Sequence, residues 1–281
     1  RNKFRQRLTI SDNIGIRQIG NYQLQGGGNM GRLVEDVVQI DTTANGQVIG
    51  TSYNDIFRLS SSEVDNGQMI YNHLLLSYST LMKRSLKDIY PNLGLAINFE
   101  TYNTLKGDFN GTISAFNSQV FLPGFFKHHS IHLVAAMQTR KKHDNLNLYS
   151  FQNRIFRARG YSYFNDRDAS TLRVNYMMPL WHPDIALGPL VYIKRFKLNG
   201  FFDNGKSNVQ LYEFKRSDLS LFRGYDVDID YSSFGAELTM DFNVIRLPYD
   251  LEIGVRVVYS TANLTNKAAT QFEFMVGNIS F

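Results

Sequence analysis

Apolar and polar side chains alternate strictly over one stretch in the C-terminal half of the chain, and this stretch decides the fold: Ala236-Glu237-Leu238-Thr239-Met240-Asp241-Phe242-Asn243-Val244. An alternation with a period of two residues predicts a β-strand that has one apolar face and one polar face. The same pattern recurs over residues 251–259, 172–180 and 93–99. We therefore expect an all-β protein built from antiparallel strands.

Working outward from this stretch, the alternation predicts nine strands, at residues 69–82, 91–103, 110–121, 130–141, 171–181, 189–203, 233–245, 250–261 and 270–281. Residues 182–185 and 246–249 are predicted to be tight turns, and residues 142–170 and 204–232 to be long loops. Residues 1–68 alternate less clearly: residues 10–16 suggest a strand, residues 25–29 a glycine-rich loop, and residues 47–49 the start of another strand. No linker divides the chain, so we expect one domain over residues 1–281.

The last predicted strand changes phase near its end. Phe272, Phe274 and Val276 share one parity, whereas Ile279 and Phe281 share the other. Gly277 lies at the switch, and a glycine inside a strand often marks a bulge. The sequence therefore predicts a bulge at Gly277.

Alternation alone is typical both of a soluble β-sandwich and of a transmembrane β-barrel. The polar faces carry charged residues, namely Glu237, Asp241, Glu252 and Arg256, which suit a wet interior better than an exposed sheet. Tyrosine and phenylalanine gather near strand ends, and short connections alternate with long ones, as in outer-membrane barrels. A membrane-spanning strand needs only about 9–11 residues, so the lack of a long apolar run is compatible with this architecture. We expect a transmembrane barrel with its apolar face toward lipid.

Composition excludes several classes of function. The 281 residues contain no cysteine, which excludes disulfide frameworks and thiolate metal sites. The net charge of +5 is spread along the chain without a basic block, so we expect no nucleic-acid partner. The chain has no Gly-x-Ser-x-Gly elbow and no convincing hydrolase constellation. We expect no enzymatic activity and no cofactor.

Two clusters of potential metal ligands are better interpreted as solvated segments. The first comprises His128, His129 and His132, with no carboxylate spaced to complete a site. The second comprises Asp226, Asp228 and Asp230, which lack the glycine and distal glutamate of a calcium loop. The metal alternative is thus the weaker interpretation for both clusters.

An arginine stands out in the predicted loop 142–170, within the segment Arg159-Gly160-Tyr161. About forty residues further on, Asp203 lies near the end of a predicted strand, within Phe201-Phe202-Asp203-Asn204-Gly205. An arginine that folds into a barrel interior is costly unless it is paired. We expect Arg159 and Asp203 to contact each other, while the simpler alternative is an exposed Arg-Gly turn.

From about residue 69 to the end, the chain resembles the BamA/TamA superfamily of outer-membrane assembly and translocation barrels. The resemblance rests on five motifs in the family's order: Asp88, Pro91 and Gly94 in a turn; Arg159-Gly160-Tyr161 in a long loop; Met178-Pro179-Leu180 at a strand end; Phe201, Asp203 and Gly205 on the next strand; and Gly277 with Phe281 in the last strand. The chain departs from the family at Ala158, where valine or isoleucine is usual, and at Asn175, where glutamate is frequent. The amino-acid sequence of residues 69–200 is also similar to that of barrels that follow a TolB-like β-propeller in some large outer-membrane proteins.

The resemblance implies a sixteen-stranded barrel in the bacterial outer membrane, of which this chain holds the C-terminal part. It implies that the Arg159 loop folds into the lumen and that Gly277, Ile279 and Phe281 form a C-terminal signal and a weak seam. The implied function is assembly or translocation of polypeptides, with lipid, lipopolysaccharide and other outer-membrane or periplasmic proteins, lipoproteins among them, as partners. The alternatives are a structural barrel that anchors a periplasmic or surface module, and a porin or ligand transporter.

Overall fold

The computed structural model describes residues 4–19, 31–32, 37–42, 48–58, 67–85, 87–108, 111–141, 151–161, 168–188, 190–214, 221–244, 250–262 and 268–279. Every regular element in these ranges is a β-strand. A search of the same ranges finds no helix with the length and apolar character needed to cross a membrane. The predicted all-β antiparallel class is confirmed.

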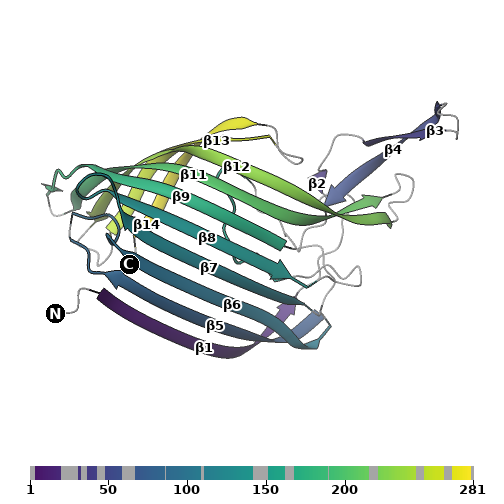
Figure 1. Cartoon of the computed structure of the whole chain (residues 1–281), viewed down its shortest axis with the longest axis horizontal. Coiled ribbons are helices and arrows are strands. Elements are labelled where there is room, and N and C mark those ends of the chain that lie inside the picture. Colours follow the sequence, from purple (N-terminus) through teal and green to yellow (C-terminus); the bar gives the residue numbers. More distant parts are fainter. Residues whose placement is uncertain are drawn as a thin grey trace.

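The strands are β1 (Phe4–Ile19), β2 (Gly31–Arg32), β3 (Val37–Thr42), β4 (Val48–Arg58), β5 (Gly67–Met82), β6 (Gly94–Gly107), β7 (Thr112–Pro123), β8 (Ser130–Arg140), β9 (Asp168–Trp181), β10 (Ile185–Leu187), β11 (Val191–Phe214), β12 (Leu221–Val244), β13 (Asp250–Ser260) and β14 (Ala269–Ile279). They pair in the order β1-β5-β6-β7-β8-β9-β11-β12-β13-β14, and each strand of this path is antiparallel to the next (Figure 1). Strand β10 continues the hairpin from β9 to β11.

The result is one curved sheet whose edges are β1 and β14 (Figure 1). Within the described ranges no pairing joins these two edges, so the sheet is consistent with a barrel but is not closed. The β3–β4 hairpin projects beyond one end of the sheet, and the end of β4 pairs with the end of β11 at Phe57 and Tyr212. The family resemblance implied that this chain holds the C-terminal part of a sixteen-stranded barrel. The described ranges contain fourteen strands, ten of them on the main path of the sheet, and the strand number of the whole barrel stays a prediction.

Most predicted strands lie within a few residues of observed ones, and the structure corrects two predictions. Residues 204–232 are not simply a long loop, because β11 runs to Phe214 and β12 begins at Leu221. The bulge predicted at Gly277 is absent, since β14 pairs with β13 without a register shift from Ala269 to Ile279. Residues 10–16 lie within β1, and β4 begins at Val48, whereas the glycine-rich segment 25–29 lies outside the described residues.

The two faces of the sheet differ sharply in polarity. On the outer face, large apolar side chains point away from the protein, with exposed fractions of 81% for Phe272, 74% for Val276 and 67% for Leu8. On the inner face, polar and charged side chains are buried, among them Asn175, Arg195, Lys197, Asn199, Asp203, Glu237, Thr239 and Asp241. This distribution is the reverse of a soluble domain, in which apolar groups lie inside.

The clusters of buried apolar groups lie where residues 151–161 cover the inner face. Phe151 packs with Met69, Tyr102 and Ile113, which come from β5, β6 and β7. Ile155 packs with three alanines, Ala115, Ala136 and Ala169, on β7, β8 and β9. The sheet thus has no second layer of regular structure in the described ranges, and this loop supplies the packing instead.

Candidate functional site

The candidate site is the loop 151–161, which crosses the inner face of the sheet between β8 and β9. It begins against β5–β7 at Phe151 and reaches β14 at Gly160, whose carbonyl oxygen accepts a hydrogen bond from Gln271 Nε2 at 3.0 Å. A non-regular segment with this much burial needs partners for its backbone polar groups. Side chains of the inner face provide them.

The first half of the loop is held by β8. The Nη2 atom of Arg140 donates to Phe151 O and to Asn153 Oδ1, each at 2.7 Å. Gln138 donates to the same Asn153 oxygen at 3.0 Å and accepts from the backbone N of Arg154 at 2.7 Å. Both side chains are buried, so the loop replaces water as their hydrogen-bonding partner.

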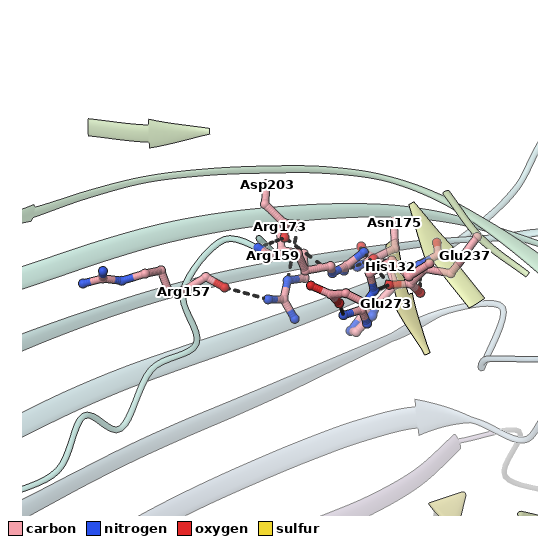
Figure 2. Close-up of polar contacts among 10 residues, drawn as sticks. His132, Arg157, Arg159, Arg173, Asn175, Asp203, Glu237 and Glu273 are labelled. Carbon is pink, nitrogen blue, oxygen red and sulfur yellow. Dashed lines mark hydrogen bonds and ion pairs between the residues drawn. The ribbon is translucent and has the colours of Figure 1, made fainter. Parts of the chain in front are cut away.

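Arg159 is the centre of the second half, and Figure 2 shows it reaching from the loop toward the strands. Its backbone N donates to Asp203 Oδ2 at 3.0 Å, and its Nε lies 3.4 Å from the same oxygen. Its Nη2 donates to Asn175 Oδ1 at 2.5 Å, and its Nη1 lies 3.1 Å from Glu237 Oε1. The guanidinium carbon also lies 3.9 Å from the centre of the Phe201 ring, a cation–π contact. The contact between Arg159 and Asp203 that the sequence suggested is therefore present.

The charges around Arg159 are shared with other arginines. Glu237 accepts from Arg256 Nε at 2.6 Å, and Arg256 also binds Glu273 of β14 at 2.8 Å. Asp203 lies 3.3 Å from Arg173 Nε, and Arg173 Nη2 donates to the carbonyl oxygen of Arg157 at 2.9 Å. These contacts link the loop to β9, β11, β12, β13 and β14 as one network.

Burial sets the electrostatics of the site. Only 8% of the Arg159 side chain and 1% of the Asp203 side chain are exposed. Burial lowers the pKa of the Arg159 guanidinium to about 10, while Glu237 and Asp203 act in the opposite direction. Arg159 is therefore charged at neutral pH, and its carboxylate partners compensate that charge in the interior.

Gly160 and Tyr161 complete the loop motif. Gly160 has a φ of 82°, and a Cβ atom there would lie 2.9 Å from Val258 Cγ1, so both conformation and space require glycine. The Tyr161 hydroxyl lies 2.6 Å from Thr261 O and 2.9 Å from Ser232 O, and these two carbonyl oxygens share its single proton as acceptors. The end of the loop is thus tied to β12 and to the residue that follows β13.

The partner motif on β11 is part of the same site. Phe201 lies against Arg159, and Asp203 binds it. Gly205 leaves room for the Tyr231 ring, which a Cβ atom would meet at 2.5 Å, and Tyr231 packs against Tyr161 with ring centres 5.6 Å apart. The structure therefore brings the loop motif and the strand motif together. Their functional role stays a prediction.

The C-terminal residues lie apart from this cluster. Gly277 is exposed on the edge strand β14, with open space where a Cβ atom would be. Ile279 is the last residue of β14, and Phe281 lies outside the described residues. Their predicted role as a signal and seam is untested.

The histidines and aspartates considered as metal ligands have separate partners. His128 binds Asp88, His129 binds Tyr176 and His132 binds Gln119. Asp228 is an exposed partner of Lys206 and Asn208. In the part of the chain that the structure describes, no three potential ligands form a metal-binding group.

The sequence pattern did not predict Glu237 and Asn175 as partners of Arg159, although alternation placed Glu237 on the polar face. The fold and site together define an antiparallel β-sheet whose polar inner face holds a loop by buried ion pairs. Comparisons with protein-family models, with curated proteins and with solved structures find no match. Function is therefore inferred from the geometry of the chain itself.

Replacing Arg159 with alanine is expected to lower the free energy of unfolding by about 3 kcal/mol, because Asp203 and Glu237 would lose a buried counter-charge. The strand content should stay the same. The matched control is Arg5→Ala, at an exposed arginine of β1, where we expect a change within about 0.5 kcal/mol. Urea unfolding followed by circular dichroism measures both, and equal stability of the two variants would contradict the buried network.

The two glycines predicted to matter should respond differently to substitution. Gly160→Ala is expected to cost about 1–3 kcal/mol because of the positive φ and the contact with Val258. Gly277→Ala should change stability little, since its position is open. The same unfolding experiment tests this pair, and a larger loss at Gly277 than at Gly160 would show that the loop conformation is not the constraint.

Proposed function

We propose that this chain forms part of the transmembrane β-barrel of a bacterial outer-membrane protein of the BamA/TamA type. Proteins of this type assemble or translocate polypeptides. The observation that carries the proposal is the reversed polarity of the sheet. Apolar side chains are exposed along β1, β9, β12, β13 and β14, whereas charges are buried on the inner face. An apolar surface of this extent needs lipid or another protein to cover it, and alternation of lipid-facing and interior-facing residues is the pattern of membrane barrels.

Aromatic side chains at one end of the sheet support a membrane boundary there. Phe125 is 83% exposed in the β7–β8 turn and stacks on Tyr176, and Trp181 is 58% exposed at the end of β9 and stacks on Phe196. Tryptophan and tyrosine favour the interface between hydrocarbon and water. Outer-membrane lipid and lipopolysaccharide are thus the expected surroundings of this face.

The filled inner face favours assembly over a porin. A porin needs an open aqueous channel, whereas loop 151–161 is held across the inner face by ion pairs and hydrogen bonds. The edge strands β1 and β14 have no strand partner on one side among the described residues, and such an edge can template an incoming strand. The mechanism needs no covalent chemistry and no cofactor. The natural partners are unfolded barrel proteins and the periplasmic proteins, lipoproteins among them, that deliver them.

Trp181 is the single tryptophan of the chain and reports directly on the outer face. In vesicles whose acyl chains carry bromine, we expect strong quenching of its fluorescence because the proposal puts it against lipid. The control is Trp181→Phe with Phe156→Trp, which moves the probe to the loop on the inner face, where brominated chains should have little effect. Quenching of Trp181 by aqueous acrylamide but not by brominated lipid would contradict the membrane assignment.

The assembly function is tested by the folding of a second, urea-denatured outer-membrane barrel into vesicles that contain this protein. We expect faster insertion than into empty vesicles, because the sheet edge offers a template. Vesicles with an unrelated porin are the control for general membrane disturbance. Quenched Trp181 together with an unchanged insertion rate would favour the alternative, a structural barrel that anchors a periplasmic or surface module.

A further inference from the structure

A second segment enters the inner face from the end opposite to loop 151–161. It is the β5–β6 turn, residues 83–93, described except at position 86. The turn precedes Gly94, which pairs with Phe121, whereas the loop follows Arg140, which pairs with Ile113 at the other end of β7. Asp88 and Ile89 are only 4% and 2% exposed, so this is not a solvated turn.

The turn reaches across the sheet rather than staying beside its own strands. Arg195 of β11 donates from Nη1 to the carbonyl oxygen of Asp88 at 3.2 Å. Strands β7, β8 and β9 lie between β6 and β11, so this contact crosses the interior. Arg195 is 2% exposed and is itself held by Asp241 at 2.5 Å, which gives the turn a fixed anchor.

A side-chain contact from the neighbouring β7–β8 turn holds the Asp88 side chain. His128 Nδ1 lies 2.7 Å from Asp88 Oδ1, while Asp88 Oδ2 accepts from Ser85 N at 2.9 Å. His128 has a φ of 67°, a left-handed conformation that residues other than glycine adopt rarely and mainly where surrounding contacts impose it. The contact between His128 and Asp88 is here called the turn latch.

The turn and the loop approach each other through two intermediate residues. The Tyr90 ring lies 4.9 Å from the His132 ring, and the His132 carbonyl oxygen accepts from Asn175 Nδ2 at 3.3 Å. The other end of that amide, Asn175 Oδ1, accepts from Arg159. A continuous chain of contacts therefore runs from the turn to the loop.

We propose that the β5–β6 turn is a second plug of the interior, held in place by the turn latch, so that the space inside the sheet is occupied from both ends. The inference rests on the proposed function only in taking the inner face as the interior of a barrel. It implies that a polypeptide or solute passing along the interior must displace this turn as well as the Arg159 loop. The segment that must move is short, and release of the His128–Asp88 contact would free it from the β7–β8 turn.

Cysteine labelling tests the plug, because the chain has no cysteine of its own. The chain carrying Ile89→Cys, folded in detergent, should resist a water-soluble maleimide, whereas Lys127→Cys, at an exposed charged position of the neighbouring turn, should react rapidly. Adding His128→Ala to Ile89→Cys should raise its labelling rate at least about tenfold. Adding His128→Asn should preserve protection, because asparagine tolerates the left-handed conformation and its amide can still donate to Asp88.

A probe in the loop separates local release from unfolding. Ile155→Cys, at a position 7% exposed, should stay protected when His128→Ala is present. The inference is overturned if Ile89→Cys reacts as fast as Lys127→Cys in the otherwise unchanged protein. It is also overturned if His128→Ala leaves the labelling rate of Ile89→Cys unchanged, or if His128→Ala exposes both Ile89→Cys and Ile155→Cys. Labelling in detergent involves no translocation. A result that contradicts the plug is therefore distinguishable from a result that contradicts the proposed assembly or translocation function.

Discussion

The buried charge of Arg159 is the constraint on which the interior of this protein depends. One guanidinium is shared by Asp203, Asn175 and Glu237, which come from three different strands. A charge so far from water is tolerated only when an opposite charge compensates it. Removal of either the guanidinium or its carboxylate partners leaves an unpaired buried charge, which destabilises the fold. The loop and the strand wall are thus held together because neither satisfies its charges alone.

The same principle extends along the inner face. Arg195 and Lys197 both bind Asp241, and Lys197 also lies 3.0 Å from Glu252. Such pairs permit an interior that is polar but occupied, filled by the loop 151–161 and the β5–β6 turn. The outer face has the opposite requirement, since its exposed apolar side chains need an apolar environment.

Local patterns predicted the parts of the fold that depend on a single strand. Alternation located β13 and β14 closely because their two faces differ over most of their length. It failed over residues 204–232, where charged residues such as Asp228 and Asp230 lie on the outer face at the far ends of β11 and β12. Apolar and polar residues still alternate there, but the polarity of the two faces is inverted, because Ile229 and Tyr231 are buried on the inner face. The backbone pairing continues through this inversion. The phase change at Gly277 was interpreted as a bulge for a similar reason, since side-chain parity can change while backbone pairing does not.

The sequence by itself determined that the chain forms antiparallel strands, which residues share a face, and that Arg159 and Asp203 are candidates for a pair. Only the tertiary structure decided that Asn175 and Glu237 complete the site, that Gln271 binds Gly160, and that the β5–β6 turn lies inside. The physical reason is the separation along the chain of the residues that interact. Alternation acts between adjacent residues, whereas these contacts join groups separated by as many as 111 positions along the chain, and their partners are selected by the curvature of the sheet.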